Sequence, residues 1–402
     1  MGNTYAGRRP GRLSRVLACA ATSVALAVAC QTTRPTVPAT TPTPTLDPAA
    51  AFGIVATIAG SGKVGDLGGG YRDGPTLSAQ FRRPGGLAMD TAGDLYIADI
   101  KNQRIRKLTP RGEVTTVAGS GPTGPMMGGY ADGPALEARF ADPIGLCVGC
   151  DGSIYVADSD NQRIRRISPE GAVSTVAGSG AFGCLLGAYV DGASTVAQFN
   201  RPYDVVADDQ GSLYVADYFN HALRRIAADG SVSTLAGTGL FGFKDAYGTL
   251  AELAYPNRIT RDRQGNLFIT EGHSRDMYER RSGNRVRRIG LDGMVTTVAG
   301  SGKADYLDGL AARAHFDTPT GLDVGPGGTL YVADYLNHCI RMITADGQVQ
   351  TVAGVCGLAG YEDGPAASAL FSYPMDVLYS ASEGLLYVAD FGNHRIRTVT
   401  VR

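Results

Sequence analysis

The sequence predicts an all-β fold: a six-bladed β-propeller of four-stranded antiparallel blades. A segment that ends in an acidic residue recurs six times at steps of 54 to 63 residues, which indicates a repeat architecture. Each period holds four short segments rich in β-favouring residues, separated by polar turns, as in a propeller blade. The acidic residues are Asp99, Asp158, Asp217, Glu271, Asp334 and Asp390.

The first repeat shows how each blade is expected to form. A short apolar strand over 86–90 is followed by a turn that contains Gly93, and a second strand over 94–99. Asn102 stands in the next turn, where its amide can satisfy backbone groups. A third strand over 104–108, a turn at 110–112 and a fourth strand over 114–118 complete the unit.

The two ends of the repeat region predict how the ring closes. The first copy of the fourth-strand pattern, Ile54–Ala59, precedes any first strand, and the last repeat stops after its third strand, Arg395–Thr400. We therefore expect the N-terminal strand to complete the last blade, which removes two exposed sheet edges.

The N-terminal region is typical of an export signal followed by a tether. Four arginines precede an apolar stretch over 16–28 that is too short to span a bilayer. The domain boundaries are therefore a signal peptide at 1–29, a Thr/Pro-rich tether at 30–51 and the propeller at 52–402. We expect an exported protein anchored to a bacterial membrane through a lipidated Cys30. Ordinary cleavage after Ala27-Val28-Ala29 is the alternative.

The composition limits the classes of partner that the protein is expected to bind. A net charge of −1 without a clustered basic face argues against nucleic-acid binding, and we expect a monomer. Cys147 and Cys150 flank a short turn and could close a small disulfide bond. Cys339 and Cys356 fit poorly, because a straight hairpin would place Cys356 about 13 Å beyond the position opposite Cys339.

Three of the repeats carry an Asn-His pair, at 220–221, 337–338 and 393–394, within the pattern Tyr-Val-Ala-Asp-x-x-Asn-His-x-hydrophobic-Arg. The first two repeats have Asn-Gln instead, and the fourth is irregular. Over about 54–402 the chain resembles the NHL-repeat family. The resemblance implies a β-propeller fold and leaves function open, because the family includes both binding platforms and enzymes.

Loop lengths predict which face carries the site. First–second and third–fourth turns share one face and are short; we call it the short-turn face. The second–third and fourth–first connections share the other, where all long loops lie, including 271–284; we call it the elaborated face. Binding sites are usually built on such loops.

Departures from glycine mark the centre of that face. The heads of the innermost strands are expected to meet at the channel mouth, and Asp204, Arg258 and Asp376 break a Gly default there, beside Tyr203 and Asn257. One interpretation is an Asp–Arg–Asp pairing that plugs the channel. The other is a divalent cation held by acids and Asn, as in gluconolactonase-type propellers, which Arg258 would oppose.

Side chains present in every repeat are expected to be structural. The Asp of each Tyr-x-Asp-Gly motif should cap a helical turn above a packed Phe, and the acid ending the second strand should pair with the Arg of the third. The spacing of these Asp residues does not match a calcium loop. His221, His338 and His394 also share one repeat position, and we interpret them as structural. The alternative is a zinc site formed by the three histidines, as in the amidating-lyase branch of NHL-like propellers.

The remaining candidates lie in irregular loops: His273, Arg275 and Tyr278 in the fourth repeat, and Met126 and Phe182 in loops before the second and third blades. Exposed, they would form an apolar patch with charged neighbours, typical of a protein or peptide contact; packed inward, they would cover the rim. The leading hypothesis is an envelope-anchored, non-catalytic platform for a protein, peptide or glycan, without a resident cofactor. The alternatives are a metal-dependent lactonase or lyase at the channel mouth and a purely structural shell.

Overall fold

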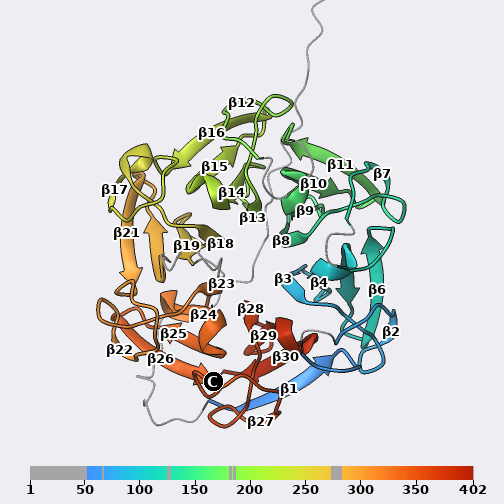
Figure 1. Ribbon diagram of the computed structural model, residues 1–402, viewed down its shortest axis with the longest axis vertical. Coiled ribbons are helices and arrows are strands. Elements are labelled where there is room, and N and C mark those ends of the chain that lie inside the picture. Colours follow the sequence, from blue (N-terminus) through green and yellow to red (C-terminus); the bar gives the residue numbers. More distant parts are fainter. Residues whose placement is uncertain are drawn as a thin grey trace, which may run out of the picture. The chain divides into compact units, whose positions relative to one another are not determined.

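The computed structural model describes residues 52–401, apart from 66–67, 125–127, 181–182, 184–186 and 273–282. Six antiparallel sheets surround a central axis, with β3, β8, β13, β18, β23 and β28 innermost (Figure 1). The predicted six-bladed all-β propeller is therefore confirmed. Its helices in the described part of the chain are single 3₁₀ turns, and none of them is long and apolar enough to cross a membrane.

Each blade has five strands rather than four. Blades one to three are β3 (Pro84–Met89), β4 (Leu95–Asp99), β5 (Arg104–Leu108), β6 (Glu113–Ala118) and β2 (Gly74–Pro75); β8 (Pro143–Val148), β9 (Ile154–Asp158), β10 (Arg163–Ile167), β11 (Ala172–Ala177) and β7 (Gly133–Pro134); and β13 (Pro202–Ala207), β14 (Leu213–Asp217), β15 (Ala222–Ile226), β16 (Ser231–Ala236) and β12 (Gly192–Ala193).

Blades four to six are β18 (Pro256–Arg261), β19 (Leu267–Glu271), β20 (Arg285–Ile289), β21 (Met294–Ala299) and β17 (Ala246–Tyr247); β23 (Pro319–Val324), β24 (Leu330–Asp334), β25 (Cys339–Ile343), β26 (Gln348–Ala353) and β22 (Gly309–Leu310); and β28 (Pro374–Ser380), β29 (Leu385–Asp390), β30 (Arg395–Thr400), β1 (Ile54–Ala59) and β27 (Gly364–Pro365). The fifth strand escaped prediction because it is two residues long, often Gly-Pro, and shows no alternating pattern.

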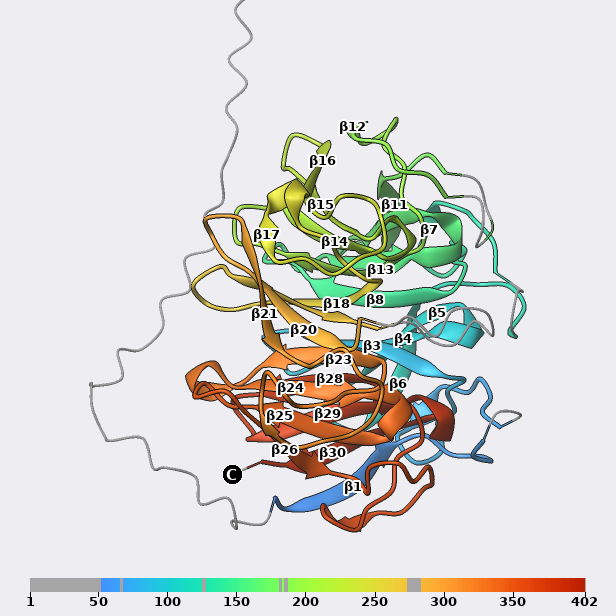
Figure 2. The ribbon, with the colours of Figure 1, turned by 60° about the vertical axis from the view of Figure 1, so that its left-hand side comes forward.

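The N-terminal strand closes the ring as predicted. β1 pairs with β30, Val55 opposite Val399, and lies beside it in Figures 1 and 2. The Gly53 amide donates to the Thr400 carbonyl at 3.1 Å. Thr400 is the last residue of a third strand, and third strands end at the short-turn face. Residue 53, which is bonded to Thr400, therefore lies on that face.

A buried arginine fixes each blade. Arg106 is fully buried; it donates to Asp99 at 2.6 Å and to Asp73 at 2.5 Å. Its guanidinium also lies over the buried ring of Phe81. The predicted pair of second-strand acid and third-strand Arg is thus confirmed, and so is the packed Phe. The predicted helix cap is wrong: the carboxylate of Asp73 accepts from Arg106 and from the Thr116 amide.

The residue just before the third strand of each blade joins that blade to the next. His221 Nδ1 accepts from the Tyr255 amide at 3.2 Å, and Gln103 Oε1 accepts from the Asp142 amide at 2.6 Å. His338 and His394 make the same bond to the following blade. In blade four Asn284 Oδ1 accepts from the Thr318 amide in the same way. Gln, His and Asn can all occupy this position because each offers an acceptor at this distance, and the contact supports the structural interpretation of the three histidines.

Both cysteine predictions are wrong. Cys339 and Cys356 form a disulfide bond across Cα atoms 5.1 Å apart, whereas Cys147 carries a free thiol and so makes no bridge to Cys150. The straight-hairpin geometry failed because β26 ends at Ala353. Gly354 then takes a φ of +94°, which turns the chain back across the start of β25.

Candidate functional site

The channel is closed by three buried charges, Asp204, Arg258 and Asp376, which we call the plug. They lie on the innermost strands of blades three, four and six. Arg258 Nη1 donates to Asp204 Oδ1 at 2.9 Å, and its Nε donates to Asp376 Oδ1 at 3.0 Å while Nη2 meets the second oxygen. Each carboxylate also accepts a backbone amide, from Ile259 and Leu87 respectively.

Burial dominates the electrostatics of the plug. It raises the pKa of Asp204 to about 6, against the attraction of Arg258 and the bond from the Ile259 amide. Burial likewise lowers the pKa of Arg258, and charge attraction from Asp204 and Asp323 partly opposes this shift. The residues therefore form a compensated ion triad, and the structure agrees with the Asp–Arg–Asp interpretation.

The same geometry fits a divalent cation poorly. Both plug carboxylates already accept from Arg258, and a cation between them would meet a guanidinium. Across the described part of the chain, no group of three His, Cys, Asp or Glu side chains is arranged to hold a metal ion. Asn257 donates to the Gly272 carbonyl at 3.4 Å rather than facing the carboxylates.

Above the plug, on the elaborated face, lies a cavity of about 240 Å³ that we call the mouth cavity. Residues of all six blades line it: Arg83, Ile100, Lys101, Asp142, Ile144, Arg201, Tyr203, Asn257, Thr320, Tyr335, Met375 and Phe391. They come from three repeat positions: the residue before the proline that opens an innermost strand, the second residue of that strand, and the 3₁₀ turn between the second and third strands.

Two predicted ligand-binding residues, Tyr203 and Asn257, line this cavity. The Tyr203 ring stacks on that of Tyr218, with centroids 3.9 Å apart. Asp204, Arg258 and Asp376 lie beneath them in the plug. The predictions for Met126, Phe182, His273, Arg275, Tyr278 and Cys30 fall outside the described residues.

Sequence reasoning missed the charged side of the mouth cavity. Arg83 and Arg201 each precede the proline that opens an innermost strand, and Lys101 lies in a 3₁₀ turn. The signal was present: Arg83, Asp142 and Arg201 share one repeat position, which holds Tyr255, Thr318 and Tyr373 in the other blades. A position that differs between repeats while its neighbours stay constant is a candidate for binding.

Below the plug the channel continues as a smaller cavity of about 170 Å³, lined in part by Cys147 and Asp323. Burial raises the pKa of Asp323 to about 6, although the Tyr379 and Val324 amides and Thr260 donate to it. Cys147 is half-buried, and desolvation raises the pKa of its thiol. Neither group reaches the mouth cavity, because the plug lies between.

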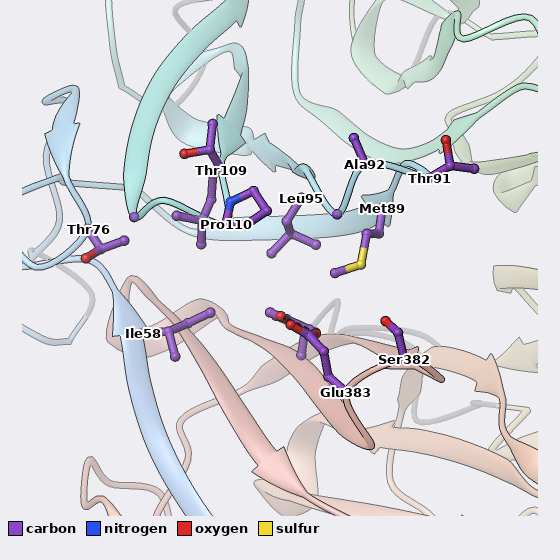
Figure 3. Close-up of a pocket in the computed structure, with 14 residues that line it drawn as sticks. Ile58, Thr76, Met89, Thr91, Ala92, Leu95, Thr109, Pro110, Ser382 and Glu383 are labelled. Carbon is purple, nitrogen blue, oxygen red and sulfur yellow. Dashed lines mark hydrogen bonds between the residues drawn. The ribbon is translucent and has the colours of Figure 1, made fainter.

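A third cavity, about 430 Å³, is a groove between blades one and six on the short-turn face. Figure 3 shows Ser382 and Glu383 of the blade-six turn opposite Met89 and Leu95 of blade one, with Ile58 of β1 at one end. Glu383 is occupied by the Tyr387 hydroxyl, which donates at 2.6 Å. Only two blades build this groove, whereas all six converge on the mouth cavity, so we treat the mouth cavity as the candidate site.

Part of the sequence matches a known repeat. Four segments, 81–108, 140–167, 316–341 and 371–398, match the NHL repeat. The chain is 28% identical over 355 residues to human NHL repeat-containing protein 2, and the alignment covers 79% of this chain and 46% of that protein. It is 28% identical over 289 residues to Protein SUPPRESSOR OF QUENCHING 1, chloroplastic, of Arabidopsis thaliana, covering 68% of this chain and 26% of the relative. The chain thus spans less than half the length of these curated relatives.

Solved structures share the fold. An auxiliary nutrient binding protein from Bacteroides thetaiotaomicron superposes with a TM-score of 0.61 at 19% identity, covering 86% of this chain and 76% of that one. At this identity the likeness concerns the fold alone.

Proposed function

Because this chain is a six-bladed β-propeller that carries NHL repeats, we propose that it is a non-catalytic binding platform. Its elaborated face engages a protein, peptide or glycan, and the mouth cavity is the anchor point. The observation that carries the proposal is the combination of a compensated plug with a mouth cavity lined by every blade. Side chains from six rigid blades give a preformed pocket, which lowers the entropic cost of binding.

The plug favours binding over metal-dependent catalysis. A lactonase or lyase of the predicted kind would place a divalent cation on carboxylates at the channel mouth. Here Arg258 donates to both candidate carboxylates, so the oxygens that would bind the cation already belong to an internal ion triad.

An envelope location would suit this arrangement. Residue 53 lies on the short-turn face, and the mouth cavity opens on the opposite one. If Cys30 is lipidated and residues 31–51 act as a tether, the chain leads from the anchor to the face without the site. The mouth cavity would then be accessible to soluble ligands on the side away from the membrane.

Ligand screening with one blocked variant tests this proposal. The full chain is applied to immobilised peptides and glycans, beside Met375→Arg, which adds a long charged side chain in the mouth cavity. Leu291→Arg is the matched control, because it makes the same addition at a residue that is 76% exposed in a third–fourth turn of the short-turn face. We expect Met375→Arg alone to lose ligands. Equal binding by both variants would contradict the platform, and chemical conversion of a bound ligand, seen by mass spectrometry, would favour the enzyme.

A further inference from the structure

The cavity of about 170 Å³ between the plug and the short-turn face, which we call the lower cavity, differs in chemistry from the mouth cavity. We propose that it binds a small organic cation, a primary ammonium group carried on a compact apolar body. The plug separates the two cavities, so this site is additional to the proposed platform and does not depend on it.

All six innermost strands build the lower cavity (Figure 1). The plug residues are the third residues of their strands and close its inner end. The fourth to sixth residues form a wall that is mostly apolar and includes Leu87, Leu146, Val206, Ile259, Leu322 and Leu378. Six rigid strands give a preformed pocket, which lowers the entropic cost of binding.

One carboxylate interrupts the apolar wall. Asp323 is the fifth residue of β23, which places it about 7 Å along the strand from the level of the plug. Its Oδ1 accepts from the Val324 amide at 2.8 Å and from the Thr260 hydroxyl at 3.2 Å, and its Oδ2 accepts from the Tyr379 amide at 2.8 Å. Within the part of the chain that the structure describes, these donors are all neutral, and no Lys, Arg or His side chain forms an ion pair with Asp323.

The charges around the lower cavity do not balance. Among the described residues that line it, Arg258 is the sole cation, and it already pairs with Asp204 and Asp376. With Asp323 the lining holds three carboxylates and one guanidinium, a net charge of −2 when all are ionised. Desolvation raises the pKa of Asp323 to about 6, so this carboxyl group is charged at pH 7.5. A bound cation would offset part of the negative charge.

An ammonium group suits the acceptors at Asp323. Its Oδ2 accepts a single bond in the structure, and the Thr260 oxygen, which donates its proton to Oδ1, keeps lone pairs of its own. The two acceptors lie side by side and can both take protons from one ammonium group. A calcium ion fits less well, because it takes about six to eight oxygen ligands and the rest of the wall is apolar.

The size of the lower cavity limits the apolar body of the ligand. A cavity of roughly 150 Å³ with apolar walls holds a molecule the size of benzene. The lower cavity, at about 170 Å³, therefore has room for one ring or a short branched alkyl group beside the ammonium group. Burying that body against the leucine side chains adds a favourable hydrophobic contribution to binding.

Calorimetric titration of the full chain with benzylamine at pH 7.5, where the amine is protonated, tests the proposal. Benzyl alcohol is the neutral twin, and we expect the amine to bind at least about tenfold more tightly. Asp323→Asn should abolish this preference. Asp209→Asn is the matched control, because it removes a carboxylate that is 70% exposed and pairs with Arg261 on the short-turn face.

A second variant keeps the test valid if Asp323→Asn does not fold, which urea unfolding would show. Ala88→Met lengthens a side chain that lines the lower cavity and leaves Asp323 in place. We expect it to lose benzylamine binding because the added atoms occupy the space of the ring. Unchanged affinity for benzylamine in either variant would overturn the inference, since the amine would then bind elsewhere.

The remaining outcomes distinguish this site from other sites and from the platform. Equal affinity for the amine and the alcohol would overturn the inference and leave an apolar cavity without charge selection. Displacement of benzylamine by equimolar Ca²⁺ would overturn it in favour of a metal ion. Met375→Arg, which blocks the mouth cavity, should bind benzylamine as the unaltered chain does. Loss of the amine in this variant would overturn the assignment to the lower cavity, whereas loss of platform ligands alone would leave it intact.

Discussion

Removing the central arginine of the plug should destabilise the protein strongly and in a pH-dependent way. In Arg258→Met, Asp204 loses a bond of 2.9 Å and Asp376 loses both bonds from the guanidinium, including the 3.0 Å bond from Nε. Two buried carboxylates then lack a counter-ion. Breaking a buried ion pair from one side costs about 3–5 kcal/mol, and we expect this loss in the free energy of unfolding at pH 8.

The pKa of Asp204 gives the sign of the pH dependence. In the native protein it is raised from 3.8 to about 6, so folding favours the protonated form. The corresponding stability is complete below pH 3.8 and is lost as the pH rises through 6. Because the charge of Arg258 lowers this pKa, the substitution raises it further. Asp204 then takes up a proton at higher pH, and the deficit of Arg258→Met should shrink between pH 8 and pH 5.

Urea unfolding at the two pH values measures this effect. The chain has no Trp, so circular dichroism or tyrosine fluorescence follows the transition. A triple variant, Asp204→Asn with Arg258→Met and Asp376→Asn, removes every charge and should recover most of the stability. A loss below about 1 kcal/mol at pH 8, equal to that at pH 5, would refute the idea that these charges compensate one another in a dry channel.

Three further predictions use neighbouring residues as controls in the same urea assay. Arg165→Met removes a fully buried blade arginine and should lower the free energy of unfolding by about 3–5 kcal/mol. Arg166→Met removes a half-exposed ion pair and should lower it by under about 1 kcal/mol. Similar losses in the two variants would contradict the role of burial. Reduction or Cys339→Ser should cost about 3 kcal/mol, since the bridge closes a 17-residue separation, and an unchanged midpoint would argue against the bond. His221→Gln should be tolerated, because Gln fills this position in blades one and two, while His221→Ala should cost about 1–3 kcal/mol by leaving the Tyr255 amide unpaired; equal effects would count against the inter-blade bond.

The propeller fold could be predicted from the sequence because the repeat shows each strand pattern several times. A second strand such as β4 shows its β-favouring residues in six copies, so the signal for each strand is reinforced. The N-terminal copy of the outer strand gave the closure through β1 in the same way. The two-residue fifth strand had no such signal, and it forms only because the loop before each blade lies against the outer edge.

The candidate site was predictable in part. Departures from glycine at strand heads found the three plug residues and two residues of the mouth cavity, because such departures stand out against the repeat. Arg83, Lys101 and Arg201 were missed because, without coordinates, nothing showed that the residue before the proline and the 3₁₀ turn face the same cavity. The Cys339–Cys356 bond was missed because one glycine reverses the chain after β26.

The sequence by itself determined the architecture: six blades, their closure by the N-terminal strand, and the face that carries the long loops. These depend on local patterns of polarity and turn residues, which the chain repeats. The tertiary structure decided which charges neutralise one another and which surround a cavity. Asp204, Arg258 and Asp376 lie on three different blades, and their pairing depends on distances across the ring that only the closed propeller sets.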